Sequence, residues 1–128
     1  MATKTGPIYL APTGTTGNPT SAAVQVPPEV DTIGINFVVE AVGATPTITL
    51  KAQGSIDGTN WFDLPYVDAT TDTLSQAAKT ITAVSAIPIW FDSGAADNRK
   101  IVAVRSVASA NTNVTFRVEL YLWDELAD

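Results

Sequence analysis

Apolar and polar residues alternate along much of this chain with the period of two that is typical of β-strands. The stretch NVTFRVELYLW, residues 113–123, shows it most clearly, with apolar side chains at positions 114, 116, 118, 120 and 122. The intervening positions hold Arg117, Glu119, Tyr121 and Trp123. Because successive side chains of a strand point to opposite faces, we predict a strand with one face in the core and a charged, aromatic face outside.

Four further segments, residues 32–42, 47–56, 79–91 and 99–107, show strand-like patterns. Pro88 cannot donate a ladder hydrogen bond, so the segment 79–91 is expected at an edge or with a bend. In residues 99–107 apolar side chains occupy both faces. For the first three segments, the residues expected on the inner face are Ile33, Ile35, Phe37, Val39, Ala41, Ile48, Leu50, Ala52, Ile56, Ile81, Ala83, Ile87, Ile89 and Phe91.

Together with short pieces at residues 21–26 and 61–64, these segments predict about seven or eight strands. No segment holds apolar residues at helical spacing for long. The fold class is therefore all-β, an antiparallel β-sandwich or jelly roll. Residues 65–78 read as the longest interior loop, and loops of this length tend to be functional or to pack on something, so we expect this one to touch a neighbour.

The first twenty residues are rich in Thr, Gly and Pro around one apolar island, Ile8, Tyr9 and Leu10. Such a composition is typical of an extended arm. We therefore divide the chain into an N-terminal arm, residues 1–20, and a single β-sandwich domain, residues 21–128. Since the apolar island has no evident core of its own to join, we predict that these three residues bind a partner.

The composition excludes most enzyme chemistry. The chain contains no His and no Cys, which removes the commonest general base and the cysteine nucleophile. A carboxylate pair drawn from Asp57, Asp63, Asp68 and Asp72 would lie in polar turn loops, which are a poor place for the desolvating pocket that an acid catalyst needs. The segment VDATTDT offers Asp68 and Asp72 as oxygen ligands for Ca²⁺, but a solvated loop explains it as well. We predict no enzyme activity, no cofactor and no metal.

Charge and hydropathy limit the partners. Seven Lys and Arg against thirteen Asp and Glu give a net charge of −6, which repels phosphate backbones, so nucleic acid is not expected as the ligand. No apolar run reaches the roughly 20 residues of a membrane helix, and no secretion signal is evident; we expect synthesis in the cytoplasm. Charged residues make up only 16% of the chain, which indicates surfaces covered by partners.

The segment SIDGTNW, residues 55–61, predicts a hairpin with an Asp-Gly turn. Trp61 and Asp63 are expected on one face of the returning strand, and Phe62 and Leu64 on the other. Trp61 has two readings, as an aromatic that closes the end of the sandwich or as an anchor for a partner. In the second reading Trp61, Tyr66 and Trp90 form a platform that stacks on a carbohydrate or a host receptor.

The sequence GSIDGTNWFDLP, residues 54–65, resembles a hairpin of the form GS-x-DG-x-x-W-x-x-L found in small β-sandwich virion proteins of tailed bacteriophages, including head decoration proteins. This resemblance implies a non-enzymatic structural protein on the exterior of the virion capsid. Its partners would be the major capsid protein or other virion proteins, and it would form a homo-oligomer. A tail, neck or fibre component and a carbohydrate or host-receptor binding module remain the alternatives. On the last strand we expect Arg117, Tyr121 and Trp123 to contact the partner, since these residue types are enriched at interface hot spots.

Overall fold

The computed structural model describes residues 3–64, 66–68, 73–75, 78–92 and 101–124, and within these ranges every regular element is a strand. Accordingly, the described ranges contain no helix that is long and apolar enough to cross a membrane. The strands are β1 (Thr3–Thr15), β2 (Val24–Gln25), β3 (Thr32–Ser55), β4 (Phe62–Asp63), β5 (Tyr66–Asp68), β6 (Thr73–Ser75), β7 (Lys79–Ile81), β8 (Ser85–Asp92) and β9 (Ala103–Asp124). The all-β prediction is confirmed.

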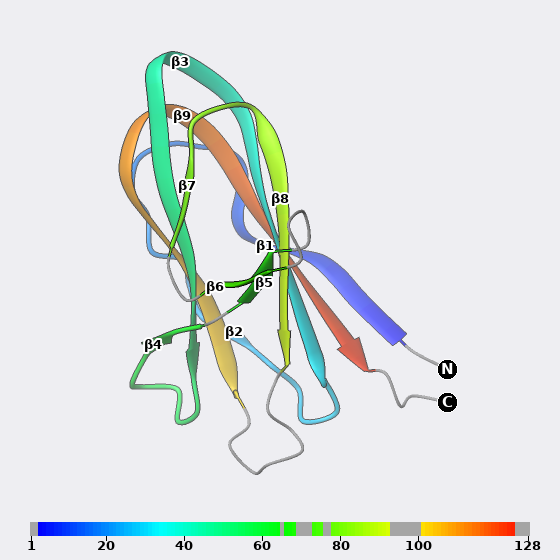
Figure 1. Ribbon diagram of the computed structural model, residues 1–128. Coiled ribbons are helices and arrows are strands. Elements are labelled where there is room, and N and C mark those ends of the chain that lie inside the picture. Colours follow the sequence, from blue (N-terminus) through cyan, green and yellow to red (C-terminus); the bar gives the residue numbers. More distant parts are fainter. Residues whose placement is uncertain (1–2, 65, 69–72, 76–77, 93–100, 125–128) are drawn as a thin grey trace.

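Two long strands, β3 and β9, form the centre of the fold. They pair antiparallel from Thr32 opposite Trp123 to Ser55 opposite Ala103. The register shifts between Val42 and Thr47 of β3, and there the paired ribbon doubles back at one end of the molecule (Figure 1). The sequence patterns at 32–42 and 47–56 predict two strands, whereas the structure has one continuous strand whose pairing with β9 is interrupted between Val42 and Thr47.

Residues with left-handed backbone mark this bend on both strands. Thr45 has φ 44° in β3, and Ala110 and Asn113 have φ 54° and 56° in β9. Residues other than glycine rarely adopt such backbone angles. The positions of glycine in the sequence therefore do not predict where the two strands bend. The side-chain amide of Asn113 donates to the carbonyl of Ala44 at 2.6 Å and ties the two bends together.

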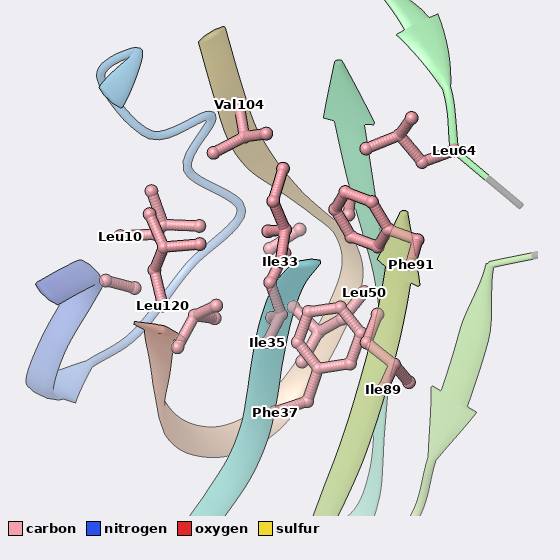
Figure 2. Close-up of a cluster of buried hydrophobic side chains, with 14 of the residues drawn as sticks. Leu10, Ile33, Ile35, Phe37, Leu50, Leu64, Ile89, Phe91, Val104 and Leu120 are labelled. Carbon is pink, nitrogen blue, oxygen red and sulfur yellow. The ribbon is translucent and has the colours of Figure 1, made fainter. Parts of the chain in front are cut away.

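The bend divides the sheet into two layers. The first layer contains residues 32–42 of β3 and 114–124 of β9, flanked by β1 on one side and by β8, β5 and β6 on the other. The second layer contains residues 47–55 of β3 and 103–109 of β9, with β2, β4 and β7. Apolar side chains of both layers fill the space between them, as Figure 2 shows for ten labelled residues from β1, β3, β8, β9 and the segment after β4.

Most of the predicted inner-face residues are buried, among them every one of the five apolar residues at positions 114 to 122. Three predictions of this kind are wrong. Ala41 lies where the ribbon begins to bend, Ala83 lies in the turn between β7 and β8, and Ile56 lies beyond the end of β3, so all three are exposed. Alternation places side chains inward only while the strand stays within its layer.

The N-terminal segment is not free of the sandwich. Residues 3–15 form β1, which pairs antiparallel with β9 of the same chain, from Thr3 opposite Asp124 to Thr15 opposite Phe116. Leu10 is only 8% exposed and belongs to the same core cluster as the residues of the other strands. The expectation that the apolar island lacks a local core is therefore wrong for Leu10, because the core partners come from distant parts of the sequence.

The segment 65–78, expected as a loop, contains two short strands. β5 pairs with β6, and Val67 and Asp68 of β5 pair with Trp90 and Ile89 of β8. This small hairpin extends the first layer beyond β8 (Figure 1). The prediction that the segment touches a neighbouring molecule stays a prediction.

Candidate partner-binding face

The outward surface of the first layer carries six of the aromatic and charged side chains that the sequence singled out. It belongs to strands β1, β9, β3 and β8, and along β3, β8 and β9 its residues alternate with those that face the core. We call it the aromatic face. Its members are Lys4, Tyr9, Gly34, Asn36, Glu40, Pro88, Trp90, Arg117, Glu119, Tyr121 and Trp123.

Two aromatic rings of β9 lie side by side on this face. The centroids of Tyr121 and Trp123 are 6.0 Å apart, with 29° between the ring planes. The indole of Trp123 lies across Gly34 of the neighbouring strand, since a Cβ at Gly34 would sit 2.5 Å from its Cζ3 atom. The Tyr121 ring also contacts β1, because the ammonium of Lys4 lies 5.2 Å from the centroid of this ring. This distance gives a cation–π attraction.

A network of hydrogen-bonded charges lies next to these rings. Glu119, which is only 8% exposed, accepts from Arg117 Nε at 3.0 Å and from Asn36 Nδ2 at 3.1 Å. Arg117 also binds Glu40 at 3.1 Å, and Glu40 accepts the main-chain N–H of Gly14 at 2.8 Å. The network therefore connects β9 to β3 and to β1.

The network changes the acidity of its members. Burial alone would raise the pKa of Glu119, but the hydrogen bonds from Arg117 and Asn36 outweigh it and leave this pKa below the ordinary value. Burial and the neighbouring charge of Glu119 raise the pKa of Tyr121. Hydrogen bonds to Glu119 and Glu40 raise that of Arg117. At neutral pH the carboxylate of Glu119 and the guanidinium of Arg117 are therefore charged, and the phenol of Tyr121 is neutral.

A groove of about 200 Å³ runs beside the rings. Tyr121, Trp123 and Lys4 line one part of it, Pro88 and Ile89 of β8 line another, and residues 34–36 of β3 complete the lining. Asn36 has a fixed orientation here, because a flipped amide would place its oxygen against the carboxylate of Glu119. Its Oδ1 atom is buried and has no hydrogen-bond partner among the described residues.

The structure brings the three predicted residues of the last strand together on one surface. Arg117, Tyr121 and Trp123 are each partly exposed, whereas Glu119, which shares their face, is buried. Of the apolar island, Tyr9 is 49% exposed on this same surface, and Ile8 packs partly against the core. Whether these residues bind a partner stays a prediction.

The proposed ligand platform is not assembled as expected. Trp90 is 45% exposed on the aromatic face, but Trp61 lies on the outward side of the second layer, where the guanidinium of Arg105 stands 4.3 Å from its ring centroid. Arg105 is held in turn by Gln53 at 2.8 Å. Trp61 and Trp90 thus belong to different surfaces, and the side chain of Tyr66 lies outside the described residues.

The Asp-Gly hairpin is confirmed in outline, with β4 paired to the end of β3. Asp57 Oδ1 accepts from the main-chain N–H groups of Thr59 and Asn60, each at 2.8 Å, and from Ser55 Oγ at 3.0 Å. These bonds hold the pKa of Asp57 far below its usual range. Gly58 has φ 81°, which suits a glycine. Because the carboxylate is fully used inside the turn, its role here is structural.

No group of three or more metal-binding side chains occurs in the part of the chain that the structure describes. The alternative of a calcium site at Asp68 and Asp72 stays a prediction, since Asp72 and the side chain of Asp68 lie outside that part. Sequence reasoning did not single out Lys4, Gly34 and Asn36. The available signals were a glycine inside a strand, which often marks close approach of another group, and a polar residue within an apolar strand.

Comparisons with known proteins show a related fold. The crystal structure of the SPBc2 prophage-derived protein YomS aligns with 96% of this chain and 95% of its own, at a TM-score of 0.72 and 12% identity. A chain in the acidic stable capsid structure of Helicobacter pylori bacteriophage KHP30 covers 100% of this chain and 95% of its own at 16% identity, but its TM-score of 0.37 is too low to indicate a shared fold. No protein-family model and no curated protein matches the sequence.

Proposed function

We propose that the chain is a non-enzymatic structural protein of a phage virion, which docks through the aromatic face. The observation that carries the proposal is the partly exposed Tyr121–Trp123 pair beside Arg117. Tyr, Trp and Arg are enriched at interface hot spots. Arg117 is held by Glu40 and Glu119, and the hydroxyl of Tyr121 donates to Glu119 at 3.4 Å. A surface with little side-chain freedom left to lose binds at a lower entropic cost.

The fold supports the choice of a virion. It is the fold of a prophage-derived protein over nearly the whole of both chains. A shared fold does not by itself imply a shared function. The structural similarity therefore supports only a phage setting, and the proposal that the chain binds another virion protein rests on the aromatic face. The absence of His and Cys from the sequence leaves few routes to catalysis.

Within the virion we propose a decoration role on the outside of the capsid, with the major capsid protein as partner. A shell that contains packaged DNA is strengthened by proteins that bind across its subunits, and multivalent binding by a homo-oligomer raises the avidity of each contact. Tail, neck and fibre positions are the competing locations.

Electron microscopy of immunogold-labelled virions tests the location, with virions purified from the strain that encodes the chain. Decoration predicts label distributed over the head. Label confined to the tail or neck would reassign the protein to that part, and virions without label would remove the structural role altogether.

A further inference from the structure

The sequence contains one Asp-Gly pair, Asp57–Gly58, and no Asn-Gly pair. At such a pair the main-chain nitrogen of the glycine can attack Cγ of the preceding side chain, because glycine has no Cβ to hinder the approach. Both residues are exposed in the hairpin between β3 and β4. By its residue types and exposure, this peptide is prone to a spontaneous rearrangement of the main chain to isoaspartate.

Isoaspartate forms in two steps that together leave the mass of the chain unchanged. In the first step Gly58 N bonds to Asp57 Cγ, and the amide hydrogen and the carboxyl OH leave as water, which closes a succinimide ring. In the second step water adds to the main-chain carbonyl carbon of Asp57, and the bond from that carbon to Gly58 N breaks. The ring closure needs a glycine N–H that is free to lose its proton. It also needs a protonated carboxyl group, since an ionised carboxylate has no good leaving group.

The hydroxyl of Ser55 occupies the attacking N–H. Gly58 N donates to Ser55 Oγ at 2.8 Å, and Asp57 N donates to the same oxygen at 3.3 Å. The hydroxyl donates its own hydrogen to Asp57 Oδ1 at 3.0 Å, so its one donor and both of its lone pairs are used. Because Ser55 is 0% exposed, water has little access to compete for these bonds.

The carboxylate of Asp57 is held toward the residues that follow it. Oδ1 also accepts the main-chain N–H groups of Thr59 and Asn60, each at 2.8 Å, and Oδ2 accepts Asn60 Nδ2 at 2.7 Å. These bonds keep the pKa of Asp57 far below its usual range, chiefly through Asn60 and Thr59, so the protonated form is scarcer than in an unfolded chain. The folded turn therefore withholds both requirements of the ring closure.

We propose that the hydrogen bonds of Ser55 and Asp57 protect the Asp57–Gly58 peptide from isoaspartate formation, and that this peptide becomes a site of covalent ageing when Ser55 is lost. Isoaspartate inserts one extra carbon, the Cβ of residue 57, into the main chain. That insertion would disturb the pairing of β4 with β3, because the turn sets its register. The protection does not depend on the virion function proposed above.

Comparison of the full chain with a peptide of residues 53–63 tests the proposal. Both are incubated at neutral pH and the same temperature, and isoaspartate at residue 57 is measured over time by mass spectrometry with electron-transfer fragmentation, which distinguishes it from aspartate. A short isolated hairpin is at best marginally stable in water, so the peptide gives the unprotected rate. We expect the full chain to rearrange more slowly by about tenfold or more, since more than one hydrogen bond must break first.

Variants of the full chain separate the turn from overall stability. Ser55→Ala frees the attacking N–H and should speed the rearrangement by about fivefold, as expected for the loss of one neutral hydrogen bond. Thr59→Ala is the matched control, because Thr59 contributes its main-chain N–H to the turn, and its rate should not change. Leu10→Ala lowers stability in the core and should also leave the rate unchanged.

Three outcomes would overturn the proposal. They are equal rates in the full chain and the peptide, a folded Ser55→Ala chain no faster than Thr59→Ala, and an acceleration by Leu10→Ala as large as that by Ser55→Ala. If Ser55→Ala does not fold, Asn60→Ala takes its place, since it removes only the bond to Asp57 Oδ2 at an exposed position. Asn60→Ala should then be faster than Thr59→Ala, and equal rates of these two variants would contradict the protection.

Discussion

At the scale of single residues, Gly34 and Gly58 resist substitution for different reasons. At Gly34 a side chain would meet the Trp123 ring, and at Gly58 the backbone angle is unfavourable for other residues. Gly34→Ala places a Cβ 2.5 Å from the far edge of the Trp123 ring, so we expect the indole to move while the free energy of unfolding changes by less than about 1 kcal/mol. Gly58→Ala has open space but φ 81°, and should cost about 1 to 2 kcal/mol without moving the indole. Denaturation curves and the Trp123 indole NMR signal measure both effects; an unmoved indole in Gly34→Ala would contradict the close packing.

The carboxylate of Asp57 gives the stability a defined pH dependence. Its pKa is lowered from 3.8 in the folded chain, chiefly by the N–H groups of Asn60 and Thr59. A depressed folded-state pKa contributes stability that is complete above pH values near 3.8 and is lost as the pH falls toward the folded-state pKa. Asp57→Asn removes the charge, so its deficit in unfolding free energy should be constant from pH 7 to 5 and shrink at pH 3. A deficit that is equal at pH 7 and pH 3 would show that the charge is irrelevant.

At the scale of elements, β1 is part of the folding unit. Leu10→Ala should lower the free energy of unfolding by about 2 to 5 kcal/mol, because it leaves a cavity in the core shared by the two layers. Tyr9→Ala, at the adjacent and half-exposed position, serves as the control and should change stability by about 0.5 kcal/mol or less. Equal effects of the two substitutions in thermal or chemical denaturation would mean that β1 pairs with the sheet without contributing to the core.

The elements also show how far the sequence predicts the fold. Alternation identified the inner faces of β3, β8 and β9, because burial on one face is a local property with a period of two. The bends carry no such signal, since Thr45, Ala110 and Asn113 turn the chain where glycine would be expected. Thr, Gly and Pro made β1 look like an arm, although its pairing partner lies more than a hundred residues further along the sequence.

The candidate site was predictable only in part, because some of its residues come together through strand pairing that leaves no local pattern in the sequence. Tyr121 and Trp123 share a strand, so their common face follows from the pattern. The groove also needs Gly34 and Asn36 from β3 and Lys4 from β1, and their arrangement depends on the register between strands that are far apart in the sequence. Trp61 and Trp90, in contrast, were grouped because both are aromatic, and the two layers separate them.

At the scale of the whole molecule, the aromatic face should contribute most to docking. Trp123→Ala is expected to weaken association with the virion by about 2 kcal/mol or more, as for other hot-spot aromatics. Its effect on the free energy of unfolding should be smaller, because Trp123 is partly exposed and rests on the outside of the first layer. Binding to purified particles and denaturation curves measure the two quantities, and Phe62→Ala, away from this face and 42% exposed, is the control. Equal losses in both assays would make Trp123 a structural residue.

The net charge of −6 should affect the rate of docking more than its strength. Long-range attraction to a basic partner surface speeds encounter and is screened beyond roughly 10 Å at 0.1 M salt. On the aromatic face, however, Glu40, Glu119 and Arg117 are already bound to one another, so few unpaired charges are left there to hold the partner. Apolar burial of the aromatic pair, which salt does not weaken, should supply most of the affinity.

Raising sodium chloride from low to near-molar concentration should therefore slow association in stopped-flow or surface-binding measurements while most of the protein stays on its particle. Complete release at modest salt would mean that charge holds the complex together, and docking through the aromatic face would then have to be abandoned.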